Sequence, residues 1–147
     1  MISVEQLEGE IIGVPFPVGE YTIEPYEHWL CADAVGSPPL PQGVAHPMFA
    51  FYVAQGGMGV TLEELFNRCH SSSDDGVMLG EVEMDWNGSF EVGATYEVTG
   101  GFTKVVRKES ARLGIMDLIT FELVVTGPDG TVTATVKNTF VYPRRES

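Results

Sequence analysis

The segment that most constrains the fold is the apolar run from Met48 to Ala54, because it has no polar face to turn toward water. A helix that is apolar all round is stable only where other elements surround it. Glycines at 56, 57 and 59 interrupt the run, so the sequence predicts a buried helix that ends near Gln55. Another part of the chain must supply a surface that encloses this helix.

That surface is expected from the second half of the chain. Region 76–142 has the alternating apolar pattern of successive strands, whereas 1–75 is rich in helix and loop signals. Helices and strands segregated in this way are typical of an α+β domain. A length of 147 residues, 44% of them hydrophobic, suits a single domain over 1–147. The turn residues at 128–130 predict the last hairpin.

Further helices are predicted on either side of the buried one. Pro25 suits a first helical position, and the apolar spacing after it predicts a helix over 25–35. The prolines and glycines of 36–44 then force a loop. Thr61 and Glu64 form a capping box that predicts a helix over 62–69. These helices are too few to cover both faces of four antiparallel strands, so we expect a dimer.

The charge balance excludes several classes of function. The net charge of −13 arises from 8 Lys plus Arg against 21 Asp plus Glu, and it repels the phosphates of nucleic acids.

No segment has the roughly 20 apolar residues of a membrane span, and the acidic start does not resemble a leader peptide. Cys31 and Cys69 lack the spacing of metal or redox sites. We expect a cytoplasmic protein with reduced thiols, no metal or cofactor, and no nucleic-acid or membrane partner.

In order and spacing, these features resemble the MaoC-like hot-dog family of (R)-specific enoyl-CoA hydratases and FAS1-like dehydratases. Residues 32–36 resemble the end of the family's first helix, and 45–49 resemble the start of its central helix. Residues 92–96 resemble a strand-opening turn of the family, and 127–130 its final hairpin. The resemblance covers almost the whole chain. It implies an α+β hot-dog fold, in which a curved antiparallel sheet wraps around a central buried helix.

The resemblance also implies a ligand and a partner. In this family two hot-dog units pair side by side, and an acyl chain on coenzyme A or a carrier protein enters the cleft between them. We therefore expect an acyl-thioester ligand and either a homodimer or a heterodimer with another hot-dog chain. The implied reaction is that of a lyase: hydration of an enoyl thioester or dehydration of a 3-hydroxyacyl thioester.

The family's usual catalytic pair is absent from its expected place. Hydratases of the family carry Gly-Asp-x-Asn-Pro-Leu-His directly after the first helix, whereas residues 36–42 here read Gly-Ser-Pro-Pro-Leu-Pro-Gln. Ser37 falls where the family has Asp, and Pro41 or Gln42 falls near its His. None of these is a strong base at neutral pH. The family also uses a backbone N–H at the position of Pro47, which has none.

Other residues are candidates for the missing roles. His46 is the first choice for proton transfer, because imidazole titrates near neutral pH. Ser37 and Asp33 are further catalytic candidates, and the backbone N–H of Met48 at a helix start is the candidate oxyanion donor. Each has a structural alternative: His46 as a histidine satisfied within the fold, and Asp33 with His28 as solvent-facing residues of a helix.

A basic cluster interrupts the acidic chain at Lys104, Arg107, Lys108 and Arg112. Paired hydrogen bonds from such side chains bind phosphate, so this cluster is the candidate site for the phosphates of coenzyme A. The alternative is a solvated turn between strands.

Three functions stay open at this point. The first is a hydratase or dehydratase that uses a relocated residue such as His46. The second is a non-catalytic hot-dog subunit that shapes the acyl pocket and pairs with a catalytic MaoC-like chain. The third is an acyl-CoA thioesterase in which Glu63 or Glu64 directs water.

Overall fold

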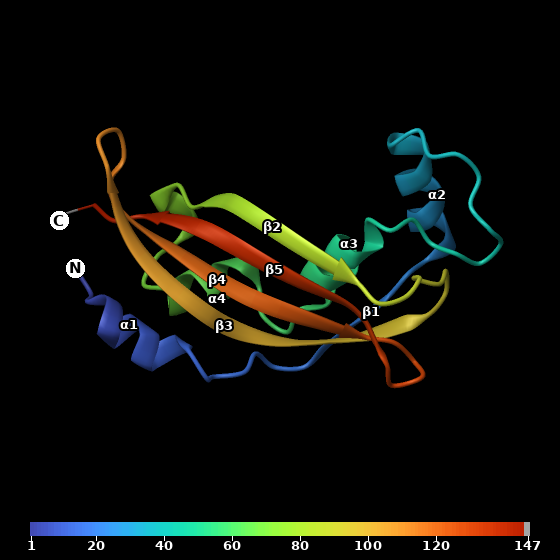
Figure 1. Ribbon diagram of the computed structural model, residues 1–147, viewed down its shortest axis with the longest axis horizontal. Coiled ribbons are helices and arrows are strands. Elements are labelled where there is room, and N and C mark those ends of the chain that lie inside the picture. Colours follow the sequence, from blue (N-terminus) through green and yellow to red (C-terminus); the bar gives the residue numbers. More distant parts are fainter. Residues whose placement is uncertain (146–147) are drawn as a thin grey trace.

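The computed structural model describes residues 1–145 and is built on a curved five-stranded antiparallel sheet (Figure 1). The strand order is β1-β3-β4-β5-β2. In chain order the elements are α1 (Val4–Ile11), β1 (Gly19–Thr22), α2 (Pro25–Ala34), α3 (Phe49–Gly57), α4 (Leu62–Arg68), the 3₁₀ turn η1 (Ser73–Asp75), β2 (Met78–Trp86), β3 (Thr95–Ser110), β4 (Gly114–Thr126) and β5 (Val132–Pro143).

Helix α3 is the central element around which the sheet bends (Figure 1). Its residues Phe49, Val53 and Ala54 are at most 1% exposed. Alternate residues of the middle strands turn toward it and are also buried, among them Ile119, Phe121, Leu123 and Val125 of β4 and Ala134 and Val136 of β5. The prediction of a curved sheet wrapped around a buried helix is therefore confirmed. One side of α3 is not buried, since Tyr52 is 40% exposed.

The glycines near the end of α3 serve close backbone packing. The helix continues to Gly57, two residues beyond the end predicted from the sequence. A Cβ on Gly57 would lie 2.7 Å from the side chain of Val98, and a Cβ on Gly19 would lie 1.8 Å from the Gly57 carbonyl oxygen. Strand β1 can therefore approach α3 only because these two positions carry no side chain.

Helix α1 was not predicted from the sequence, because its acidic residues hide a weak amphipathic pattern. Ser3 caps the helix by accepting a hydrogen bond from the backbone N–H of Gln6 at 3.1 Å. Leu7 and Ile11, four residues apart, are 0% and 4% exposed. The helix packs along β3. Strand β1 pairs with only the first residues of β3, so α1 covers a part of that edge which would otherwise be open.

Helix α2 is present where it was predicted, but its apolar side chains are not buried. Tyr26, Trp29 and Leu30 are 64%, 66% and 52% exposed. The helix and the loop that follows it project beyond one end of the sheet (Figure 1). The helix therefore has exposed apolar side chains that the described part of this chain does not cover.

A buried ion network ties both ends of the chain to the sheet. Asp117 is 0% exposed and accepts hydrogen bonds from Nε of Arg107 at 2.8 Å and from Nε of Arg144 at 2.7 Å. Arg107 also donates to the Ile2 carbonyl oxygen, and Arg144 to that of Cys69. Burial opposes the charge on Asp117, but the hydrogen bonds from the two guanidinium groups outweigh it and lower the pKa of the carboxyl.

Candidate functional site

Helix α2 and the proline-rich loop after it enclose an open cavity of about 410 Å³, called here the α2 pocket. His28, Trp29, Ala32 and Asp33 of the helix line it, together with residues 36–40 of the loop. The pocket therefore brings together Asp33 and Ser37, two of the site residues predicted from the sequence. His46 is not among its lining residues.

His28 supplies the imidazole of the α2 pocket. Its ring lies 6.4 Å from the ring of Phe49 on α3, measured between centroids. The ring atom Nδ1 is buried and has no hydrogen-bond partner within residues 1–145. A buried polar atom without a hydrogen-bond partner is uncommon in folded proteins. Helical spacing alone predicts a solvent-facing position for His28, so the sequence favours His46 over it.

The other polar residues of the pocket do not form an aligned acid–base pair with His28. The Ser37 hydroxyl donates to the carbonyl oxygen of the adjacent Pro38 at 3.0 Å. Asp33 is exposed at the C-terminal end of α2. Within the described residues no hydrogen bond or salt bridge joins either side chain to His28.

His46 is half-buried at the start of α3, where it caps the backbone. Its Nδ1 accepts a hydrogen bond from the backbone N–H of Met48 at 3.1 Å, so the neutral ring carries its proton on Nε2. The N–H of Phe49 donates to the His46 carbonyl oxygen at 3.0 Å, and the N–H of Ala50 donates to that of Pro47 at 3.1 Å. The Met48 N–H predicted as oxyanion donor is therefore already used, as are the two that follow it.

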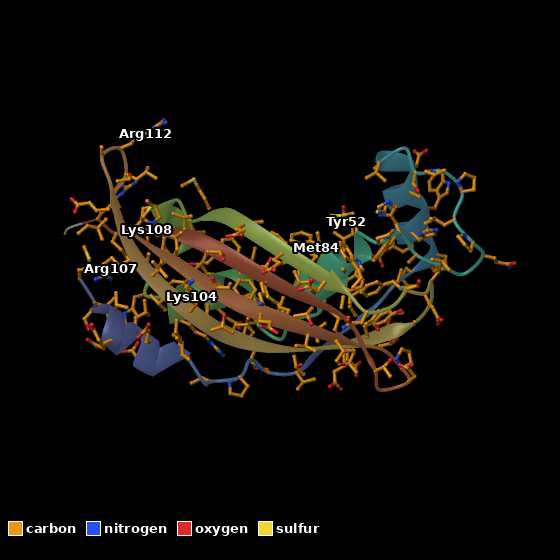
Figure 2. All side chains as sticks on the ribbon, viewed as in Figure 1. Tyr52, Met84, Lys104, Arg107, Lys108 and Arg112 are labelled. Atoms are coloured by element: carbon orange, nitrogen blue, oxygen red, sulfur yellow. The ribbon has the colours of Figure 1, made fainter. Side chains whose placement is uncertain are left out.

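An apolar strip runs between α3 and the edge strand β2, and its members are Tyr52, Val82, Met84 and Trp86. Figure 2 shows Tyr52 of α3 beside Met84 of β2, two elements that are in contact. Trp86 is 45% exposed, and its indole N–H donates to the Pro47 carbonyl oxygen at 2.9 Å. This bond fixes β2 against the start of α3. The α3–β2 strip thus offers an apolar surface next to the helix start.

A buried amide that was not predicted from the sequence lies between α3 and the sheet. Asn138 of β5 is 0% exposed, and its Oδ1 accepts from Nε2 of Gln55 at 2.8 Å. Its Nδ2 has no partner within residues 1–145. The signal in the sequence is an asparagine at an inward position of a strand, between Val136 and Phe140, where an apolar residue is expected.

The sheet divides the predicted basic cluster. Arg107 turns inward, where Asp117 and the Ile2 carbonyl oxygen hold it, so the phosphate-binding prediction requires correction at this residue. Lys104, Lys108 and Arg112 are exposed. Figure 2 shows them in the half of the molecule away from α2. These three remain candidates for binding phosphate, at a distance from the α2 pocket.

The thioesterase candidates lie apart from this region. Glu63 and Glu64 are exposed on α4, where Glu63 accepts a hydrogen bond from the Ser73 backbone at 3.2 Å, and neither lines the α2 pocket. Among residues 1–145, no group of three or more His, Cys, Asp and Glu side chains could hold a metal ion. No helix in the described part of the chain is both long and apolar enough to cross a membrane.

Comparisons with known proteins identify the fold. No family model matches the sequence, and no curated protein matches it. The chain is similar in structure to the ChsH1-ChsH2 complex from Mycobacterium tuberculosis (17% identity, TM-score 0.66, 98% of this chain and 91% of that one). It is also similar to the HadBC (3R-hydroxyacyl-ACP dehydratase) complex from Mycobacterium tuberculosis (14% identity, TM-score 0.60, 86% of this chain and 95% of that one). A third similar structure is a MaoC-like dehydratase from Rhodospirillum rubrum (16% identity, TM-score 0.53, 96% of this chain and 98% of that one). The chain therefore has the hot-dog fold.

Proposed function

We propose that this chain is an acyl-thioester-binding subunit of an enoyl-thioester hydratase or 3-hydroxyacyl-thioester dehydratase, and that it shapes the acyl cleft without transferring protons. The observation that supports this proposal is the start of α3. The backbone N–H groups of Met48, Phe49 and Ala50 are all hydrogen-bonded within their own turn. Hydration of an enoyl thioester needs a free donor that stabilises negative charge on the thioester oxygen. This helix start offers none.

The residues around the cleft support the same proposal. Ser37, and Pro41 or Gln42, stand where the resemblance expects the proton-transferring pair, and none of them is a base at neutral pH. The α3–β2 strip is apolar and partly exposed, as a surface that contacts an acyl chain must be. Two of the similar structures are complexes, and one of these is named a dehydratase. A binding subunit beside a separate catalytic chain accounts for all three features.

A second candidate is a hydratase that acts alone through His28. The α2 pocket favours it, because His28, Asp33 and Ser37 line the same cavity. In this alternative the imidazole passes a proton between water and the α-carbon as the hydroxyl adds to the β-carbon. It still lacks an oxyanion donor at the helix start, so it ranks second.

Hydration assays distinguish these candidates. The purified chain is incubated with crotonyl-CoA and with longer enoyl-CoA thioesters, and loss of the conjugated enoyl absorbance is followed. We expect no rate above buffer. Removal of a general acid–base group lowers turnover by about 10²–10⁴-fold. Turnover that falls by this factor in His28→Ala would replace the proposal with the second candidate. The same loss in His46→Ala would instead support the relocated-histidine mechanism.

A further inference from the structure

Two amide side chains, Gln55 of α3 and Asn138 of β5, interrupt the apolar surroundings of the α3–β2 strip. Gln55 is half-buried, Asn138 is 0% exposed, and a single hydrogen bond of 2.8 Å joins them. Nδ2 of Asn138 has no partner within residues 1–145. A buried polar group costs free energy unless its hydrogen bonds are made. Exceptions of this kind to an inward apolar pattern are expected at functional sites.

The strand register places the amide pair on the α3–β2 strip. On the helix, Gln55 follows Tyr52 by three residues, so both side chains lie on the same side of α3. Tyr52 lies beside Met84 of β2 (Figure 2). Val82, the next member of the strip after Met84, is opposite Asn138 in the pairing of β2 with β5. The amide pair therefore lies one step further along the strip than Tyr52 and Met84.

The other end of the strip is the start of α3, where Trp86 is bonded to the Pro47 carbonyl oxygen. From Met48 to Gln55 the chain advances by about 10 Å, at about 1.5 Å per helical residue. An extended chain of about eight carbons has this length, since its C–C bonds of about 1.5 Å follow a zigzag. A thioester bound at the helix start would thus bring about the eighth carbon of its acyl chain to the amide pair.

We infer that Gln55 and Asn138 select acyl thioesters that carry a hydroxyl group about eight carbons along the acyl chain. The inference rests on the proposed function, because it takes the strip as the surface that contacts the acyl chain. The hydroxyl oxygen accepts a hydrogen bond from Nδ2 of Asn138. Its hydrogen is donated to Oε1 of Gln55, the amide atom that the bond to Asn138 does not use.

The two amides have different roles in this selection. Asn138 is enclosed in the sheet between Val82 and Phe121, its neighbours on β2 and β4, so it supplies a donor at a fixed position. Gln55 is half-buried on a helix, and rotation about its side-chain bonds admits the ligand. A hydrocarbon at the same place leaves the Asn138 donor unpaired and covers the amide of Gln55. Sites built to bond a hydroxyl group reject analogues that lack it for this reason.

Two coenzyme A thioesters of equal chain length test the selection. In ω-hydroxyoctanoyl-CoA the acyl chain ends in a hydroxyl group, and in nonanoyl-CoA a methyl group replaces that hydroxyl. Binding of each to the purified chain is measured by isothermal titration calorimetry. We expect the hydroxylated ligand to bind about 10-fold more tightly, which is the ratio that corresponds to about 1.4 kcal/mol of net hydrogen bonding.

Leucine substitutions in the amide pair should abolish this preference. Asn138→Leu removes the fixed donor and Gln55→Leu removes the acceptor, so each variant should bind nonanoyl-CoA at least as tightly as the hydroxylated ligand. Urea denaturation of both variants confirms that they are folded. The control Gln6→Leu makes the same chemical change at an exposed position on α1, and it should keep the preference of the unmodified chain.

NMR of the side-chain amides locates the bound hydroxyl group. The Asn138 amide signal, identified by its absence from Asn138→Leu, should shift with ω-hydroxyoctanoyl-CoA much more than with nonanoyl-CoA. Equal affinity of the unmodified chain for the two ligands would overturn the inference and leave the proposed function standing, as would a preference that persists in both leucine variants of the pair. Binding of neither ligand would instead remove the proposed function, and the inference with it.

Discussion

Substituting Asp117 with asparagine removes the anion shared by Arg107 and Arg144 while keeping the shape of the side chain. Asp117 is 0% exposed, and the side chains of Arg144 and Arg107 are 7% and 25% exposed. Removing one member of a buried ion pair costs about 3–5 kcal/mol. Arg107 can partly regain water, and the amide oxygen still accepts a hydrogen bond, so we expect the lower end, about 3 kcal/mol. For a chain of this size that lowers Tm by roughly 6–12 °C.

Urea denaturation followed by circular dichroism measures this effect, and its pH dependence tests the cause. The pKa of Asp117 is lowered in the folded state. The stabilisation by its ionised form is therefore complete above the unfolded-state pKa of about 3.9 and is lost as pH falls through the lower folded pKa. The difference in free energy of unfolding between the unmodified chain and Asp117→Asn should be constant from about pH 5 to 7 and shrink below about pH 4.

The control for this prediction is Asp85→Asn, the same chemical change at an exposed position. It should alter the free energy of unfolding by no more than about 0.5 kcal/mol. The reasoning is refuted if Asp117→Asn unfolds within about 1 kcal/mol of the unmodified chain at pH 7. A difference that grows on acidification would contradict it equally.

Three further predictions concern the core. Asn138→Leu should raise the free energy of unfolding by about 1 kcal/mol in urea melts, because it removes a buried unpaired donor and half-buried Gln55 can turn to water. A fall in the free energy of unfolding by more than about 2 kcal/mol would contradict this. Gly19→Ala should lower the free energy of unfolding by about 1–3 kcal/mol, because its Cβ meets an α3 carbonyl oxygen. Gly9→Ala, with open space around it, should instead stabilise α1. Equal effects of the two substitutions would refute the packing account. Burial raises the pKa of the Cys69 thiol to about 11, so this thiol should resist alkylation at pH 8 until urea unfolds the chain; rapid alkylation of the native protein would show that it is accessible.

The central features of the fold were predictable because they follow from strong local patterns. An apolar run closed by glycines, followed by alternating strands, requires a sheet that encloses a helix. Helix α1 was missed because its apolar pattern consists of only Val4, Leu7 and Ile11 among acidic residues. The exposure of Trp29 could not be predicted either, because helical spacing of apolar residues does not reveal whether the same chain covers them.

The candidate site was less predictable because it depends on contacts between elements. Asp33 and Ser37 share a pocket, although the sequence analysis singled them out for separate reasons. The use of the Met48 N–H by the His46 ring depends on a side-chain rotamer, which no sequence pattern specifies. Arg107 faces Asp117 across a hairpin, so its ion pair was visible only once the strand register was known.

The most direct test of the account is the rate of enoyl-thioester hydration by the native complex that contains this chain. The complex is isolated with either the unmodified chain or its double variant His28→Ala, His46→Ala, and Tm is measured on both to confirm that each is folded. A subunit that binds the acyl group without transferring protons predicts rates within about twofold of each other, since loss of a true general acid–base group costs about 10²–10⁴-fold. A fall of about 100-fold or more in the folded variant complex would show that this chain carries out the proton transfer itself.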